Sequence, residues 1–464
     1  MKESTRKIFI WEKDFSRQML RIALPMALQN LVSASAHIVD GLMVSGLGDA
    51  HYAAVTQAGR YSFLFQLFLF GAASGTSIFI SQFWGKQDVS GIRKVMSICL
   101  RITVGLALLF LLGGLLLPRQ IASLFLQEGE SRALAAEYLQ WVGLNYLFCG
   151  IDIVFSNTLR ATGKPTVAMA AGIMGILTNT VCNWVLIYGR LGMPALGVKG
   201  AAIATVLAAG VSMLVNVSYT YLKHQPGAIR PREMKMPEKR FALDYIKRVL
   251  PVVANEGLWS LGITIYAVFY GMRGDTAVNA IGIHGNVDQL MTVLLFGLVN
   301  ATAIMIGVAI GAGQREKAIQ TSRRMLFAVE CLSVVTGVGL IFLRYPILGL
   351  FSKLSPETIA SAARILLIAG CMMPFRFFNT INIVGVLRAG GDTIYSMVLD
   401  AGSVWVIGVP AVALATLALG LPIEGIFLFS YLEEMVKLGV GLPRFLSGKW
   451  INDLTVIGAK EEKA

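Results

Sequence analysis

Several carboxylates lie inside stretches of the chain that are otherwise apolar, and four of them stand out: Asp40, Glu256, Asp288 and Asp400. Placing a charged carboxylate at the centre of a membrane helix costs about 2.5 to 3.5 kcal/mol even on the most lenient scale. A carboxylate in such a place can take up a proton or a cation and thereby change the local charge. We therefore treat these four acids as candidates for ion coupling.

The first of these acids belongs to a segment that is repeated later in the chain. The stretch LPMALQN contains Pro25 and Asn30, and 226 positions later LPVVANE contains Pro251 and Glu256. A proline inside a helix removes one backbone hydrogen bond, so both prolines are predicted hinges. The same offset pairs further residues: Gly48 with Gly274, Asp49 with Asp275, Gly71 with Gly297, and Gly85 with Gly311.

Composition indicates a membrane protein. Hydrophobic residues make up 55% of the 464 residues, charged residues make up 14%, and the mean hydropathy is +0.67, far too apolar for a soluble protein of this length. A helix needs roughly 20 apolar residues to cross the hydrocarbon core. We therefore predict an all-α polytopic membrane protein with twelve transmembrane helices in two pseudo-symmetric six-helix lobes. The predicted spans are 18-45, 53-82, 95-117, 133-158, 165-188, 198-222, 245-272, 278-309, 322-343, 360-386, 394-418 and 424-446.

The basic residues are distributed as membrane topology predicts. The net charge is +13, but with a cytoplasmic N-terminus most Lys and Arg fall in cytoplasmic loops and tails, so no nucleic-acid partner is expected. The densest basic run follows the sixth span, contains prolines, and predicts a cytoplasmic linker. We expect a multi-pass protein of the cell (inner) membrane with both termini cytoplasmic. Its expected parts are an N-terminal lobe 1-222, a linker 223-244 and a C-terminal lobe 245-464.

Helix ends provide further repeated features. Spans four and ten end in LRATGKPT and LRAGGDT, which place Arg160 and Arg388 at tight turns. We expect both guanidinium groups to bind free carbonyls at the C-termini of their helices. Asp49 and Asp275, just before spans two and eight, are expected to be helix N-caps.

Together these features resemble the multidrug and toxic compound extrusion (MATE) family of antiporters. The resemblance is carried by the two sixfold repeats, the LP start of spans one and seven, the doubled LRAxG turns and the segment GVKGAAIAT that begins span six. It covers nearly the whole chain. The resemblance implies two six-helix lobes around a central cavity, and efflux of organic, often cationic and amphipathic, compounds in exchange for protons or sodium ions.

The resemblance also implies roles for particular residues. It pairs Asp40 with Asn179 and Asn183, which share one helix face at i,i+4 spacing. It makes Glu256 a cation site, and Asp288 could complete a cluster with it in the second lobe.

Span ten departs from the family, because it offers only Asn379 and Asn382 where an acid is common. The predicted site residues are Asp40, Glu256, Asp288 and Asp400 for ion coupling; Asn30, His37, Asn179, Asn183 and Asn379 for the substrate cavity; Pro25 and Pro251 for the hinges; and Glu256 and Asp288 for sodium.

The predicted function is secondary active antiport. The chain is not expected to be an enzyme, because His37, His51, His224 and His284 form no HExxH motif or equivalent. No cofactor is expected apart from the coupling ion, H+ or Na+, and the expected partners of the monomer are drug-like small molecules and the lipid bilayer. A flippase for lipid-linked saccharides is the alternative, although it would need a more cationic cavity for pyrophosphate. A channel would not need two repeated lobes with buried acids.

Overall fold

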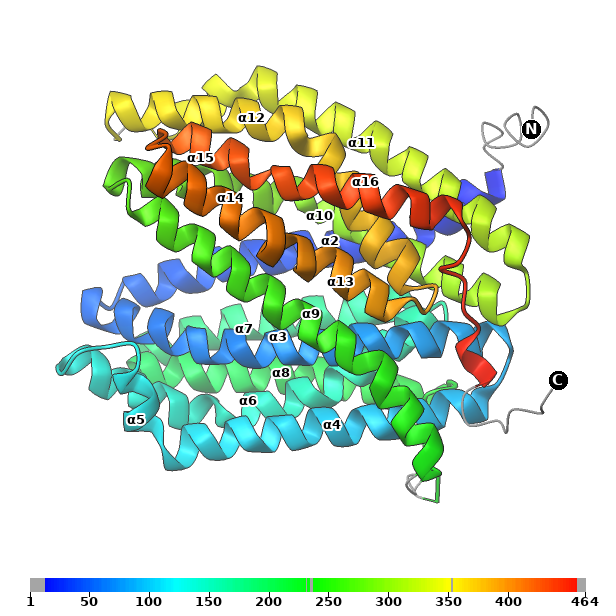
Figure 1. Ribbon diagram of the computed structural model, residues 1–464. Helices are drawn as coiled ribbons and strands as arrows, with labels where there is room; N and C mark the ends of the chain where they lie inside the picture. Colours follow the sequence, from blue (N-terminus) through cyan, green and yellow to red (C-terminus); the bar gives the residue numbers. More distant parts are fainter. Residues whose placement is uncertain (1–12, 231, 234–236, 352–353, 457–464) are drawn as a thin grey trace. The chain divides into compact units, whose positions relative to one another are not determined.

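The structure is helical throughout the part of the chain that it describes. The computed structural model describes residues 13–230, 232–233, 237–351 and 354–456, and the regular elements within these ranges are all helices (Figure 1). The α-helices are α2 (Lys13–Ser45), α3 (Asp49–Gly85), α4 (Val89–Leu116), α5 (Pro118–Ser123), α6 (Glu130–Ala161), α7 (Pro165–Tyr188), α8 (Gly197–Leu222), α9 (Lys239–Gly271), α10 (Asp275–Gly311), α11 (Arg315–Gly349), α12 (Pro356–Thr380), α13 (Thr393–Ser403), α14 (Val409–Ala413), α15 (Ile423–Ser430) and α16 (Leu432–Leu446). Three π-helical segments, η1 (Ile381–Arg388), η2 (Val404–Gly408) and η3 (Leu414–Ala418), and the 3-10 helix η4 (Leu454–Val456) complete the list.

Eleven helical stretches of the described chain are long and apolar enough to cross a membrane. They cover eleven of the twelve predicted spans. The twelfth, 424-446, is formed by α15 and α16, which meet at Tyr431 and lie end to end in Figure 1. Each of these two helices alone is shorter than the roughly 20 residues that a span needs. The chain is thus an all-α polytopic membrane protein, as its composition predicts.

The N-cap residues of α3 and α10 lie one position before the residues that the sequence predicts as caps. α3 begins at Asp49 and α10 at Asp275, and the N-cap residues are Gly48 and Gly274, with φ of 108° and 83°. The expectation that the aspartates are N-caps is wrong, because the cap position has a positive φ that favours glycine. The carboxylates stand in the first turn instead, where they interact favourably with the helix dipole.

Packing divides the chain into two units, and α2 and α9 each contribute to both. One unit consists of the chain up to Ala27 together with Ala254–Leu454. The other consists of Leu28–Val253 together with the chain from Thr455. The two exchange points are 226 positions apart, and each follows a repeat proline by two residues. The units therefore differ from the expected lobes 1-222 and 245-464, because the lobes exchange the first parts of their first helices.

Two glycines that are equivalent in the repeat make close contacts with the exchanged segments of α2 and α9. A Cβ atom on Gly297 of α10 would lie 2.8 Å from the carbonyl oxygen of Ala23 in α2. A Cβ atom on Gly71 of α3 would lie 2.8 Å from the Cα atom of Val253 in α9. The repeat thus encodes the same close helix contact twice, once within each unit.

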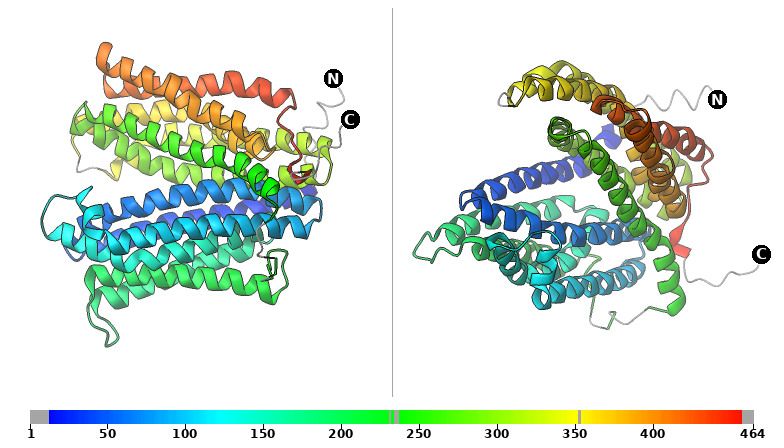
Figure 2. Two further views of the ribbon diagram at one scale, coloured as in Figure 1. Left: turned by 60° about the horizontal axis from the view of Figure 1, so that its bottom comes forward. Right: turned by 60° about the vertical axis from the view of Figure 1, so that its left-hand side comes forward.

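Each unit is a bundle of helices (Figures 1 and 2), and each has its own cluster of buried apolar side chains. In the unit that contains Leu28–Val253, α6 packs against α3, α4 and α8, and α7 packs against α8. In the other unit, α10, α11 and α12 pack against one another, and α16 packs against α12 and α13. All three π-helical segments belong to this second unit, and such segments frequently occur at functional sites.

Candidate functional site

Asp40 of α2 lies beside two amides of α7. Asn183 Nδ2 donates to Asp40 Oδ1 at 2.9 Å and to Asn179 Oδ1 at 3.0 Å. With the Asn179 amide turned the other way round, its nitrogen donates to both oxygens of Asp40, at 2.6 and 3.0 Å. Both asparagines are buried. The structure thus brings together the acid and the two amides that the resemblance pairs.

The other predicted residues of α2 flank this site along the helix. Pro25 is buried and lies inside α2, as Pro251 lies inside α9. Asn30 is partly exposed. The side chain of His37 lies outside the described residues. Because each proline lacks a backbone N–H, each helix is weakened at the turn that precedes its exchange point.

The two turn arginines bind side chains of α2 and α9. Arg388 Nη1 donates to Glu256 Oε1 at 2.8 Å, in an ion pair whose side chains are 3% and 15% exposed. Arg160 Nη2 donates to Gln29 Oε1 at 3.0 Å, and its Nη1 donates to Asn157. The expectation that both arginines bind helix C-terminal carbonyls is therefore wrong. Helical side chains point back toward the N-terminus of their helix, which directs these guanidinium groups away from the carbonyls that follow them.

Asp288 is held by a different arginine. Both terminal nitrogens of Arg376 donate to its carboxylate, and the bond to Oδ2 measures 2.9 Å. In the described ranges, no group of three or more His, Cys, Asp or Glu side chains could hold a metal ion. Glu256 and Asp288, the predicted sodium ligands, each face a guanidinium of their own, and these contacts do not fit a shared sodium site.

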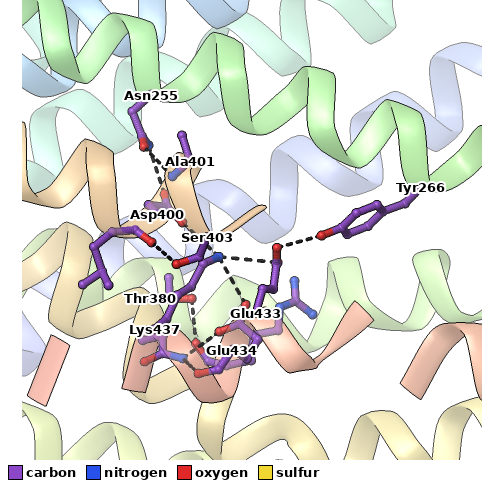
Figure 3. A network of polar contacts seen from close by, with 12 residues as sticks. Asn255, Tyr266, Thr380, Asp400, Ala401, Ser403, Glu433, Glu434 and Lys437 are labelled. Carbon is purple, nitrogen blue, oxygen red and sulfur yellow. Dashed lines mark hydrogen bonds and ion pairs between the residues drawn. The ribbon is translucent and has the colours of Figure 1, made fainter. Parts of the chain in front are cut away.

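Asp400 of α13 takes part in a larger network (Figure 3). Lys437 Nζ of α16 lies 3.1 Å from Asp400, 3.4 Å from Glu433 and 3.6 Å from Glu434. Asn255 Nδ2 donates to Asp400 at 3.0 Å. We call Lys437, Asp400, Glu433 and Glu434 the Lys437 group.

The Lys437 group is bound from two further helices. The hydroxyl of Tyr266 in α9 donates to Glu433 at 2.7 Å. Asn379 of α12, predicted to line the cavity, donates from Nδ2 to the carboxylate of Glu434 at 2.8 Å and to its backbone oxygen at 2.7 Å. Figure 3 shows the side chains of Tyr266, Asp400, Glu433, Glu434 and Lys437 pointing toward one another.

Sequence reasoning did not identify Lys437. The residue lies within the predicted apolar span 424-446. The signal was present in EEMVK, which places Glu433 and Glu434 four and three residues before the lysine, on one helix face.

The sequence matches the MatE family over residues 25–185 and 251–414. The matched segments begin at Pro25 and Pro251, the two prolines of the repeat. The chain belongs to the MATE family. Members of the family are transporters, so this MATE protein is a membrane transporter and not an enzyme.

Named relatives agree with this assignment. The chain is 28% identical over 421 residues to the uncharacterized transporter YisQ of Bacillus subtilis, covering 89% of this chain and 90% of YisQ. It is 25% identical over 446 residues to the probable multidrug resistance protein NorM of Thermotoga maritima, covering 94% and 93% of the two chains.

Two of the similar solved structures are of MATE in different conformations. The structure described as bent has a TM-score of 0.84, and the one described as straight has a TM-score of 0.83. Both are 22% identical to this MATE protein; the bent one covers 94% of this chain and 96% of its own, the straight one 94% and 97%. At this identity the likeness shows the fold.

Proposed function

We propose that this MATE transporter is a secondary active antiporter that exports organic, cationic or amphipathic compounds in exchange for protons. The observation that carries the proposal is the site at Asp40, where a carboxylate within a membrane helix is oriented by the amides of Asn183 and Asn179. Proton uptake at Asp40 would remove one negative charge from the helix bundle. The description of the relative NorM as a multidrug resistance protein supports this substrate class.

Coupling then follows from competition. If a proton and a cationic substrate favour opposite charge states of Asp40, each lowers the affinity for the other, and their fluxes become opposed. One charge that moves through 100 mV supplies about 2.3 kcal/mol. Since 1.4 kcal/mol is a factor of ten, one proton can support a substrate gradient of roughly forty-fold.

Protons are favoured over sodium by the contacts of the remaining acids. Glu256 and Asp288 pair with Arg388 and Arg376, so a sodium ion at either acid would have to displace a guanidinium. The same pairing disfavours the flippase alternative, because these arginines already neutralise carboxylates and are not available for a lipid pyrophosphate.

We also propose that the transporter acts as a monomer in the cell membrane, with both termini in the cytoplasm. The location of Lys and Arg in the loops and tails supports this orientation.

The test is ethidium efflux from cells, with the proton and sodium gradients collapsed separately. Loss of the proton gradient should stop efflux, and loss of the sodium gradient should not. Asp40→Asn keeps the shape of the side chain but removes its titratable charge, so it should abolish proton-driven efflux at normal expression. Asp49→Asn, in the exposed first turn of α3, is the matched control. An Asp40→Asn variant that exports ethidium at the parental rate, with unchanged pH dependence, would exclude Asp40 as the coupling residue.

A further inference from the structure

The buried Lys437 faces more carboxylates than it can neutralise. Asp400, Glu433 and Glu434 all lie within 3.6 Å of its ammonium group. The side chain of Lys437 is 3% exposed, and those of the three acids are 16%, 6% and 14% exposed. A single positive charge is therefore paired with three carboxylates, and all four side chains are largely buried.

The nearest arginines interact electrostatically with Asp400 and Glu434, but they make their ion pairs with other acids. Arg376 and Arg388 are already paired with Asp288 and Glu256. An uncompensated carboxylate inside a membrane costs about 2.5 to 3.5 kcal/mol. Uptake of a proton by one acid of the Lys437 group removes part of that cost.

The hydrogen bonds show which acid is suited to take the proton. Each acid accepts one bond from a neutral side chain: Tyr266 Oη to Glu433 Oε2 at 2.7 Å, Asn255 Nδ2 to Asp400 Oδ2 at 3.0 Å, and Asn379 Nδ2 to Glu434 Oε2 at 2.8 Å. An amide nitrogen only donates, whereas a tyrosine hydroxyl both donates and accepts. A protonated Glu433 can therefore reverse its bond and donate to Tyr266. Glu433 is also the most buried of the three acids.

The backbone leaves room for this pair of side chains. Gly408 ends the π-helical segment η2. A Cβ atom at this position would lie 2.5 Å from Glu433 Oε2 and would collide with the hydroxyl of Tyr266. The close approach of Tyr266 and Glu433 thus depends on a glycine in an irregular turn, which is a feature independent of the charges.

We propose that Glu433 is a proton-binding residue of this unit, with Lys437 as its counter-charge and Tyr266 as its reversible hydrogen-bond partner. The inference rests on the proposed antiport and adds to Asp40 a second acid that releases a proton when a cationic substrate binds. Sodium is a poorer occupant, because the ammonium of Lys437 already lies where the three carboxylates converge.

Other titratable groups interact with the Lys437 group or with its neighbour Arg376, and they enter any pH experiment. They are Tyr270 of α9, His284 and Asp288 of α10, Arg376 of α12, Arg388 of η1 and Tyr431. Among these, only histidine has an ordinary titration range near neutral pH. A His284→Gln variant therefore belongs among the controls.

The experiment measures proton release from the full chain in lipid nanodiscs, in weakly buffered solution, when ethidium is added. Glu433→Gln should reduce the release by about one half, because two acids share it, and Asp40→Asn should remove the other part. Two control variants, Glu330→Gln and His284→Gln, should release as many protons as the wild type. Glu330 lies in α11 and accepts a hydrogen bond from Ser333 of the same helix. Full release from Glu433→Gln would overturn the second site even where efflux remains proton-driven. The absence of release from the wild type would instead overturn the antiport itself.

Infrared difference spectroscopy provides a readout that does not depend on transport. In an Asp40→Asn background, where Asp40 contributes no band, the protein should show a carboxylic acid band that disappears when Glu433→Gln is added, and persistence of the band in that double variant would overturn the assignment. Tyr266→Phe keeps every carboxylate and should shift the band, since it removes the hydrogen-bond partner. If Glu433→Gln does not fold, Tyr266→Phe tests the assignment instead. An unshifted band in Tyr266→Phe would exclude Glu433 as the protonated acid.

Discussion

Arg388 and Glu256 form a buried ion pair of 2.8 Å that joins the end of η1 to α9, the helix of Pro251. Removing one partner of such a pair leaves the other charge buried and unpaired, at a cost of about 3 to 5 kcal/mol. We expect Glu256→Leu and Arg388→Leu each to lower the melting temperature of the purified protein strongly. The double variant should be more stable than either single variant.

The melting temperature can be followed by size-exclusion chromatography after heating. If the losses of the two single variants simply add in the double variant, the two side chains do not interact and the ion pair is refuted.

The close helix contacts at Gly297 and Gly71 should tolerate no side chain. Gly297→Ala and Gly71→Ala each place a Cβ atom 2.8 Å from a backbone atom of the exchanged helix. We expect each to destabilise the protein by about 1 to 3 kcal/mol, the usual cost of overpacking. Gly105→Ala is the matched control, since a Cβ atom there meets nothing within 4 Å. Equal melting temperatures for all three variants would contradict the close contacts.

The described part of the linker is held to α4 by a carboxylate whose effect depends on pH. Glu233 accepts a hydrogen bond from the backbone N–H of Arg230 and an ion pair from Arg93, and these donors lower the pKa of Glu233. A lowered acid pKa stabilises the folded arrangement at neutral pH. That stabilisation is lost as the pH falls through the lowered value, below the ordinary glutamate pKa of about 4.3.

We therefore expect Glu233→Gln to speed hydrogen exchange of the amides of residues 227–230 at pH 7. The change should be less than about fivefold, because exposed pairs contribute only about 0 to 1 kcal/mol. The wild type should approach the variant in acid. A variant that exchanges like the wild type at pH 7 would show that Glu233 does not hold the linker.

The proposed orientation makes Gly227 cytoplasmic. A reporter that is active only in the cytoplasm should work when fused at Gly227 or at either terminus. A fusion at Gly227 that is active only outside the cell would mean that an odd number of spans precedes the linker.

Local features could be predicted from the sequence itself, whereas the long-range pairing of Asp40 with Asn179 and Asn183 was implied only by the family resemblance. The length of the apolar runs predicted the spans, the repeat picked out Pro25 and Pro251, and the i,i+4 spacing predicted the shared face of Asn179 and Asn183. By contrast, Arg376 and Asp288 are 88 residues apart, and nothing in their spacing shows which helices face each other. Lys437 was missed because one lysine hardly alters the mean hydropathy of a span.

The exchange of helix segments also has a consequence for biogenesis. The first part of α2 is among the first segments that the ribosome makes, yet its contact at Gly297 is made more than 250 residues later. During synthesis this segment must remain inserted without its final neighbour until α10 has followed it. A fragment that ends at the linker would lack the first part of α9, which packs on α3, and would leave the first part of α2 without its partner. The exchange therefore means that neither unit can complete its packing until synthesis has passed the linker: one unit needs the first part of α9, and the other needs α10.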